Sequence, residues 1–132
     1  MIDFDLQFFT WSDDRIYFAA QSNNNKLVLC AGNDSVHFVD TRAYDNTINA
    51  GDGDDSIWVG ERSSINNVDL NNGNDKMYFG YYALNNTINA GDGNDVISIA
   101  SGVGFIDGES GADQIYFGSH VYATIQSSES LS

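Results

Sequence analysis

The sequence contains no proline, one cysteine and five basic residues against 19 acidic ones. The single cysteine, Cys30, excludes a framework of intramolecular disulfides. The formal net charge of −14 repels nucleic acid and anionic membrane surfaces and attracts cations, which argues against nucleic-acid binding. No apolar run approaches the roughly 18 residues of a membrane-spanning helix, so we expect no membrane insertion.

The chain also lacks helical periodicity and a recognisable secretory leader. Its first 14 residues are acidic, unlike the start of a cleaved signal peptide, so export would need another route. What it has instead is 13 glycines with many Asn and Asp residues, a composition typical of tight turns between short strands. Hydrophobic residues make up 42% of the 132 residues, enough for one domain.

An aspartate followed by an alternating apolar strand occurs six times. The intervals between these aspartates are 20, 21, 20, 20 and 18 residues. A strand in every repeat of about 20 residues predicts a solenoid, in which like residues stack on like residues. The stacked aspartates are Asp14, Asp34, Asp55, Asp75, Asp95 and Asp113.

Each repeat reads as two short strands around a tight turn. Alternation places Ile48 and Ala50 on one face before the turn, and Ile57 and Val59 on one face after it. The fold class is therefore all-β, a parallel β-roll or β-helix of about six coils with two parallel sheets. The same inner positions recur as Leu27, Leu29, Val36 and Phe38, as Val68, Leu70, Met77 and Phe79, as Ile88, Ala90, Ile97 and Ile99, and as Ile106, Gly108, Ile115 and Phe117.

A second, variable turn connects one coil to the next. Each of these turns contains an apolar residue that we expect to close the core there: Tyr44, Ile65, Leu84 and Val103. The pattern degrades at both ends, as is usual for solenoid caps. We therefore predict a single β-solenoid domain over 1–132, with a cap strand in 1–13, coils in 14–117, and a cap or tail in 118–132.

Stacked aspartates repel one another. Two carboxylates about 5 Å apart repel by about 1 kcal/mol in water and about 3 kcal/mol at an effective dielectric constant of 20. Over five neighbouring pairs, this approaches the entire stability of a small domain, so something positive must lie between them. Hard carboxylate and carbonyl oxygens, with no recurring sulfur or imidazole, favour calcium over zinc or copper.

The turns resemble the nonapeptide GGxGxDxUx of the repeats-in-toxin (RTX) family of hemolysin-type calcium-binding proteins. The copies are 50–55 (AGDGDD), 70–75 (LNNGND) and 90–95 (AGDGND), with weaker copies at 29–34 (LCAGND) and 108–113 (GESGAD). The resemblance implies calcium ions between consecutive coils, held by the aspartates and by glycine carbonyl oxygens. It carries the metal-ligand role to Asp34, Asp55, Asp75, Asp95, Asp113, Gly32, Gly51, Gly53, Gly73, Gly91, Gly93 and Gly111.

The resemblance also implies a protein that folds on binding calcium and is secreted or displayed on the cell surface, by type I export without an N-terminal signal peptide. The sequence departs from the family in having the motif on only one edge of each coil, so we expect one row of ions instead of two. The first turn lacks glycine, and Cys30, Asn71 and Glu109 replace a glycine. Hydrogen-bonded Asp and Asn ladders without metal are the alternative reading.

Outward positions after the acidic turns form a largely aromatic column. Tyr17, Trp58, Tyr78 and Tyr116 could bind a glycan, a partner or a second copy of the chain, or could stabilise an exposed sheet through cross-strand pairs. No set of nucleophile, base and orienting group stands out, so we expect no enzyme activity. An accessory module of a polysaccharide-modifying enzyme and an ice-binding protein are further alternatives, although the acidic edge lacks the threonines expected for ice binding.

Overall fold

The computed structural model of the protein describes residues 7–8, 11–18, 23–38, 44–64, 66–119 and 121–126. Within these residues the chain forms thirteen strands and no helix. The strands are β1 (Gln7–Phe8), β2 (Arg15–Phe18), β3 (Lys26–Val28), β4 (Ser35–Phe38), β5 (Thr47–Asn49), β6 (Ser56–Val59), β7 (Asn67–Asp69), β8 (Lys76–Phe79), β9 (Ala83–Asn89), β10 (Val96–Ile99), β11 (Gly102–Asp107), β12 (Gln114–Phe117) and β13 (Val121–Gln126).

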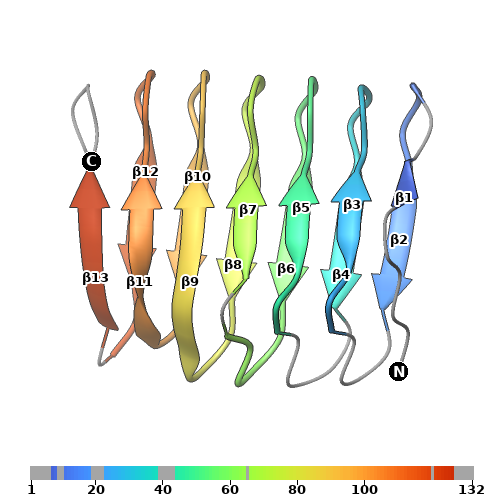
Figure 1. Ribbon diagram of the computed structural model, residues 1–132. Coiled ribbons are helices and arrows are strands. Elements are labelled where there is room, and N and C mark those ends of the chain that lie inside the picture. The colour runs from blue at the N-terminus through green and yellow to red at the C-terminus, as the bar shows by residue number, and fades with distance from the viewer. Residues whose placement is uncertain are drawn as a thin grey trace.

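The strands alternate between two parallel sheets. Sheet A has the order β1-β3-β5-β7-β9-β11-β13, and sheet B has the order β2-β4-β6-β8-β10-β12. Each strand thus pairs with the strand two further along the chain. In β6 and β8, for example, Ile57 pairs with Met77. Figure 1 shows the resulting stack of coils, with the acidic turns along the top. The predicted fold class, an all-β parallel solenoid with two sheets and about six coils, is confirmed.

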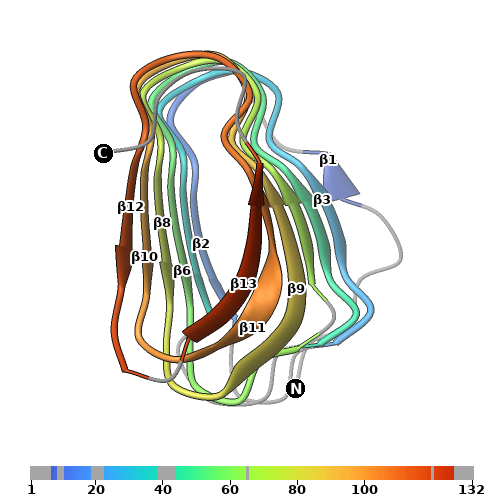
Figure 2. The same ribbon diagram turned by 90° about the vertical axis from the view of Figure 1, so that its left-hand side faces the viewer.

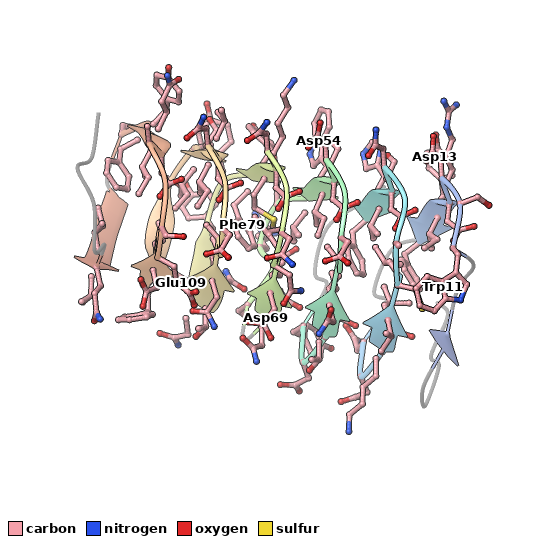
Figure 3. All side chains as sticks on the ribbon, turned by 90° about the horizontal axis from the view of Figure 1, so that it is seen from above. Trp11, Asp13, Asp54, Asp69, Phe79 and Glu109 are labelled. Atoms are coloured by element: carbon pink, nitrogen blue, oxygen red, sulfur yellow. The ribbon has the colours of Figure 1, made fainter. Side chains whose placement is uncertain are left out.

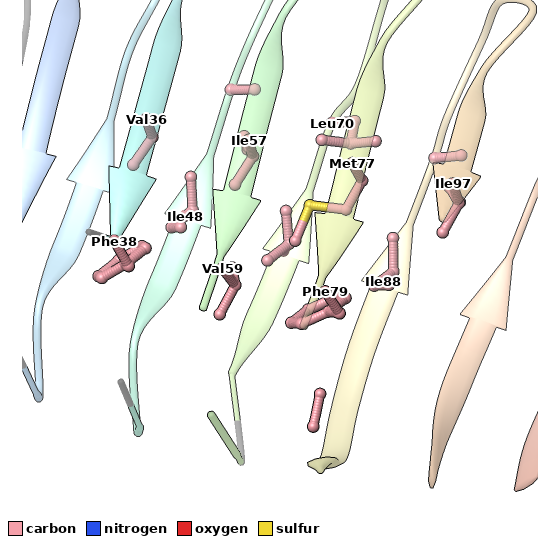
Figure 4. Packing of buried hydrophobic residues seen from close by; sticks show 14 of the residues in the cluster. Val36, Phe38, Ile48, Ile57, Val59, Leu70, Met77, Phe79, Ile88 and Ile97 are labelled. Carbon is pink, nitrogen blue, oxygen red and sulfur yellow. The ribbon is translucent and has the colours of Figure 1, made fainter. Parts of the chain in front are cut away.

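The core fills the space between the two sheets. The predicted inner residues of the four middle coils are all buried, among them Ile48, Ile57 and Phe79 (Figure 4). Because the register repeats, identical positions stack directly: the rings of Phe18 and Phe38 lie parallel with centroids 4.7 Å apart. Burying one such side chain contributes about 1.5–3 kcal/mol, so the inner stripe supplies most of the driving force for folding.

The inner stripe is incomplete at the C-terminal end. Phe117 is 44% exposed and Ile115 is half-buried, although both occupy positions that are buried in earlier coils. Sheet B ends at β12, so no described strand covers these two side chains. The expectation that the stripe would be buried throughout is therefore wrong for this last coil.

Buried amides line the variable turn. Tyr44 and Leu84 are exposed, so the expectation that they close the core is wrong; the side chains of Ile65 and Val103 lie outside the described residues. The buried residues there include a ladder of asparagines one coil apart. It runs through Asn25, Asn46, Asn66 and Asn86.

Each rung of this ladder uses both donors of one asparagine. The backbone amide and the side-chain Nδ2 of Asn46 both donate to Oδ1 of Asn66, at 3.2 Å and 3.0 Å. Asn25 makes the same pair of bonds to Asn46, and Asn66 to Asn86. The last amide, Nδ2 of Asn86, donates to the carbonyl of Ser63. The ladder thus satisfies its buried polar groups without any ion.

The two end strands of sheet A pair over different lengths. β1 pairs with β3 through two residues, and β13 pairs with β11 through six. The division into a cap strand, coils and a C-terminal cap stays a prediction. No helix within the described residues is long and apolar enough to cross a membrane.

Candidate metal-binding edge

The acidic turns stack so closely that one position accepts only glycine. Gly53 has φ 135°, and a Cβ there would lie 1.8 Å from the carbonyl oxygen of Gly32 in the previous coil. Gly73, Gly93 and Gly111 show the same geometry. An L-residue is strained at this φ and has no space for its side chain, so the glycine spacing follows directly from the stacking.

The residue two positions earlier in the turn is also left-handed. Gly51 and Gly91 occupy it in two coils, and Cys30, Asn71 and Glu109 occupy it in the others, with φ of 78°, 74° and 55°. The turn conformation is therefore kept where the glycine is replaced. A left-handed residue other than glycine costs about 1–2 kcal/mol, least for Asn, so the turns of Cys30 and Glu109 carry most of this strain.

The motif aspartates point inward and form a file along the edge. All five are at most 2% exposed. In each, Oδ1 accepts a hydrogen bond from the backbone amide of the aspartate one coil earlier. The distances are 2.7 Å from Asp14 to Asp34, 2.8 Å from Asp34 to Asp55, 2.7 Å from Asp55 to Asp75, 2.8 Å from Asp75 to Asp95 and 3.0 Å from Asp95 to Asp113.

The second oxygen of each carboxylate has no hydrogen-bond partner. This holds for Oδ2 of all five aspartates, and all five atoms are buried. Burial above all, together with the neighbouring carboxylates, raises the pKa of Asp55, Asp75 and Asp95 to about 7, against the lowering effect of the backbone hydrogen bond. The pKa of Asp34 is raised for the same first reason. A row of such oxygens requires a proton or a cation.

The arrangement fits a cation that takes few carboxylates. Within the described residues, no three His, Cys, Asp or Glu side chains converge on one point, because the aspartates stand in single file. An ion between two coils could therefore contact two carboxylates at most and would take its other ligands from backbone carbonyls or water. Calcium accepts such mixed oxygen shells of roughly 6–8 ligands, whereas zinc prefers four nitrogen or sulfur ligands.

The glycines predicted as ligands line the same edge. The carbonyl of Gly51 accepts a hydrogen bond from the amide of Asn72 at 3.1 Å, and that of Gly91 accepts one from Ser110 at 3.0 Å. The carbonyls of Gly32, Gly53 and Gly73 face the glycine one coil further along. A carbonyl oxygen has a second lone pair, so these contacts leave room for a cation. Their role as ligands stays a prediction.

A second ladder runs along the outer surface of the same turns. The side-chain oxygen of Asp54 accepts from the amide of Asn74 at 2.8 Å, and Asp13, Asn33, Asn74 and Asn94 repeat this contact. Viewed from above the turns, Asp13 and Asp54 lie on the sheet B side, whereas Asp69 and Glu109 lie on the opposite side (Figure 3).

The fold and this edge together define a class of protein, the parallel β-solenoid with a file of carboxylates in glycine turns. The model of the RTX calcium-binding nonapeptide repeat matches the chain in four copies, over residues 38–61, 83–103 and 105–119. The resemblance seen in the turns is therefore confirmed. The Asp75 turn, where two asparagines stand in for Gly and Asp, lies outside the matched residues. No match was found among curated proteins or solved structures.

The aromatic column on sheet B is in register, as predicted. Tyr17, His37, Trp58 and Tyr78 are consecutive partners. The rings of His37 and Trp58 stack with centroids 4.7 Å apart and planes inclined by 13°, while Trp58 and Tyr78 meet edge to face at 4.9 Å. The rings therefore contact one another along the solenoid axis, which is the geometry of stabilising cross-strand pairs.

Proposed function

We propose that this protein is a calcium-cemented structural module, in which ions between consecutive coils neutralise the file of buried aspartates. The observation that carries this proposal is the row of five buried Oδ2 atoms without a partner. Such atoms cost stability unless they are protonated or bound to a cation. With 19 acidic and five basic residues, the acidic groups of the chain far outnumber its positive charges.

The proposed ions lie between Asp34 and Asp55, Asp55 and Asp75, Asp75 and Asp95, and Asp95 and Asp113. Each would take carboxylate oxygens from two neighbouring coils. The glycine carbonyls of the same turns would complete the coordination shell. Five turns with a motif aspartate and a glycine leave four such places between coils, and hence four ions. Calcium supplies only charge and coordination in this scheme. The inner stripe and the asparagine ladder provide the other contacts that stabilise the stack of coils.

Calcium binding and folding would then be coupled. Without calcium, the repulsion along the file opposes the packing of the coils, and with calcium the binding free energy adds to stability. Such a protein suits a secreted or cell-surface location, where the calcium concentration is millimolar. Export by a type I system would agree with the resemblance to RTX proteins. The module would act structurally or as an adhesive element and would have no catalytic activity of its own.

A calorimetric titration with a matched pair of variants tests the proposal. Asp75→Asn removes a buried carboxylate from the file, whereas Asp54→Asn removes an exposed one from the same edge, at a position where an amide oxygen can still accept the same hydrogen bond. We expect about four calcium ions per chain for the parent and the Asp54→Asn variant, and fewer for Asp75→Asn. Magnesium should bind much more weakly, since it demands a tighter octahedral shell.

Circular dichroism with and without a chelator provides the second readout. We expect the sheet spectrum and the melting temperature to fall on chelation and to recover when calcium is added back. A sheet spectrum and melting point unaffected by chelator, together with no heat of calcium binding, would reject the proposal in favour of ladders that hold no metal.

A second candidate function is binding of a glycan or a protein partner through Tyr17, Trp58, Tyr78 and Tyr116. The exposure of the column favours it, since Trp58 is 49% and Tyr17 is 62% exposed. The stacking of His37 on Trp58 weighs against a sugar platform, because it occupies a ring face that a sugar would need. Glycan-array binding that Trp58→Ala abolishes and Tyr81→Ala leaves intact would support it; Tyr81 is equally exposed but lies on the variable turn.

A further inference from the structure

Asn72 stands at the tip of an acidic turn, in a column whose neighbouring members are aspartates. Parallel bridges pair Asn72 with Asp52 in the previous coil and with Asp92 in the next coil. All three residues are exposed. Figure 2 looks along the stack and shows the turns of successive coils superposed at the top. Asn72 is therefore an accessible amide at a position where both adjacent coils carry a carboxylate.

Asn72 is also followed by a glycine, Gly73, and this is the one Asn-Gly pair in the sequence. Glycine has no side chain to hinder attack by its own backbone nitrogen, and it allows the widest range of backbone dihedral angles. In a flexible chain, that nitrogen can therefore reach the side-chain carbonyl carbon of the preceding asparagine. Asn72 is thus the asparagine of this chain that is most prone to deamidation.

Deamidation closes a five-membered ring and then opens it with water. The backbone nitrogen of Gly73 gives up its proton to solvent base and bonds to Cγ of Asn72; the bond from Cγ to Nδ2 breaks, and ammonia leaves. Water then opens the succinimide, to aspartate when the bond from nitrogen to Cγ breaks and to isoaspartate when the bond to the backbone carbonyl carbon breaks. One water is consumed and one ammonia is released, with no oxidation or reduction.

In the stack, the groups that this reaction must move are held by the neighbouring coils. The attacking amide of Gly73 donates a hydrogen bond to the carbonyl oxygen of Asp92 at 2.9 Å. Nδ2 of Asn72, the leaving group, donates to Oδ1 of Asp52 at 2.8 Å. The backbone amide of Asn72 donates to the carbonyl oxygen of Gly51 at 3.1 Å. Ring closure therefore requires the turn to separate from both neighbouring coils.

We propose that Asn72 is a conditional modification site, which deamidates in chains whose acidic turns are unstacked and is protected in chains whose coils are stacked. The sequence supplies the reactive pair, and the hydrogen bonds to the neighbouring coils supply the protection. The modification is irreversible, because ammonia is lost to solvent. It therefore records whether a chain has spent time in the unstacked state.

Both products disturb the turn when the chain stacks again. An aspartate at this position adds a carboxylate between Asp52 and Asp92 and removes the hydrogen bond that Asn72 donates to Asp52. Isoaspartate lengthens the backbone by one methylene just before Gly73. Even a Cβ on Gly73 would lie 1.8 Å from the carbonyl oxygen of Gly53, so the stack has no room for the longer turn.

Peptide mapping of folded and unfolded protein tests the site. Protein that circular dichroism shows to be folded in calcium, and the same protein in guanidinium chloride, are held at one pH and temperature and then digested with trypsin. Cleavage after Arg62 and Lys76 releases residues 63–76, in which four other asparagines serve as internal controls: Asn66, Asn67, Asn71 and Asn74. We expect deamidation at Asn72, located by fragmentation of this peptide, to be at least tenfold faster in the unfolded chain.

Equal rates in the two states would overturn the protection by the stack. Earlier conversion at another asparagine, or no conversion in the unfolded chain, would overturn the site. Asn72→Gln is the control variant, because glutamine keeps an amide but closes a six-membered ring far more slowly. In the unfolded state this variant should lose the conversion at position 72, whereas the slower reactions of the other four asparagines should be unchanged.

A third sample, in chelator without denaturant, separates this proposal from the calcium proposal. If calcium stabilises the stack, deamidation of Asn72 in chelator should approach the rate of the unfolded chain. A rate that stays at the folded value in chelator but rises in guanidinium chloride would contradict the calcium proposal alone and would support the modification site.

Refolding tests whether the modification marks the chain. Deamidated chains that are returned to calcium should recover less sheet signal in circular dichroism than the Asn72→Asp variant, which has the added carboxylate but a backbone of normal length. Equal recovery would show that the isoaspartyl turn stacks again, and it would overturn the proposed record of unstacking.

Discussion

The two edges of the solenoid solve the same stacking problem with different side chains. At the variable turns, Oδ1 of an asparagine accepts from the backbone amide of the previous coil, and at the acidic turns Oδ1 of an aspartate does the same. The difference lies in the second atom of the side chain. Nδ2 of Asn66 donates to the next rung, whereas Oδ2 of Asp75 has no partner.

This difference indicates that the asparagine edge is complete by itself and the acidic edge is not. An amide ladder satisfies its own donors and acceptors, so it stabilises the stack under any condition. A carboxylate ladder leaves one buried charged oxygen per coil, so it stabilises the stack only when a proton or a cation is present. One edge is therefore permanent and the other is conditional, within the same coils.

Converting the permanent edge into a conditional one should have the largest effect. Asn66→Asp removes the donor to Asn86 and buries a charge among amides, so we expect a loss of about 3–5 kcal/mol of unfolding free energy. Chemical denaturation in calcium measures it. Calcium should not restore the loss, because the asparagine turns lack the stacked glycine turn of the acidic edge. Rescue by calcium would show that the two edges are interchangeable.

The next largest effect should be a pH dependence of stability in chelator, which distinguishes the acidic edge from the asparagine edge. Folding raises the pKa of Asp55, Asp75 and Asp95 from 3.8 to about 7, so the folded state binds more protons between these values. The stability that this provides is complete below about pH 4 and is lost as the pH rises through 7. Melting temperatures in chelator should therefore fall from pH 5 to pH 8.

Calcium should weaken this dependence, since it competes with protons for the same oxygens. We expect the gain in melting temperature on adding calcium to be larger at pH 8 than at pH 5. A melting temperature in chelator that rises from pH 5 to pH 8 would mean that the buried carboxylates do not govern the acidic edge.

Completing the acidic edge with an amide should have a smaller effect, and one whose sign depends on calcium. In Asp75→Asn, Nδ2 can donate to Oδ1 of Asp95, as Asn66 does to Asn86. We expect this variant to gain about 1–3 kcal/mol in chelator, because an uncompensated charge is removed. In calcium it should be less stable than the parent. Denaturation curves in both conditions, with Asp54→Asn as the exposed control, measure the crossover.

The sequence predicts more of the acidic edge than of the asparagine edge, for physical reasons. Alternation predicts the inner stripe, and the 20-residue interval predicts the aspartate file, because both follow from backbone period alone. The asparagine ladder has the same interval, at Asn25, Asn46, Asn66 and Asn86, and that signal could have found it. Asparagine is so common in turns that its inward orientation does not stand out there.

The orientation of the aspartates within their turn could not be predicted either. Strand alternation fixes which way a side chain points only inside a strand, and the aspartates precede their strands by one residue. The bonding of Oδ1, and hence the isolation of Oδ2, depends on the left-handed turn geometry. Likewise, the exposure of Phe117 depends on where sheet B ends, which no local pattern encodes.

The smallest effect should come from relieving backbone strain, and it too should differ between the edges. Cys30 is left-handed at φ 78°, in the place that Gly51 and Gly91 take in other acidic turns. Cys30→Gly should gain about 0.5–1 kcal/mol, since the relief of strain exceeds the cost of the more flexible unfolded chain. Asn24, at φ 59°, lies beside the asparagine ladder, and Asn24→Gly should gain almost nothing because Asn tolerates this conformation. Chemical denaturation measures both gains. Equal gains from the two substitutions would mean that the cost of a left-handed residue does not depend on its type.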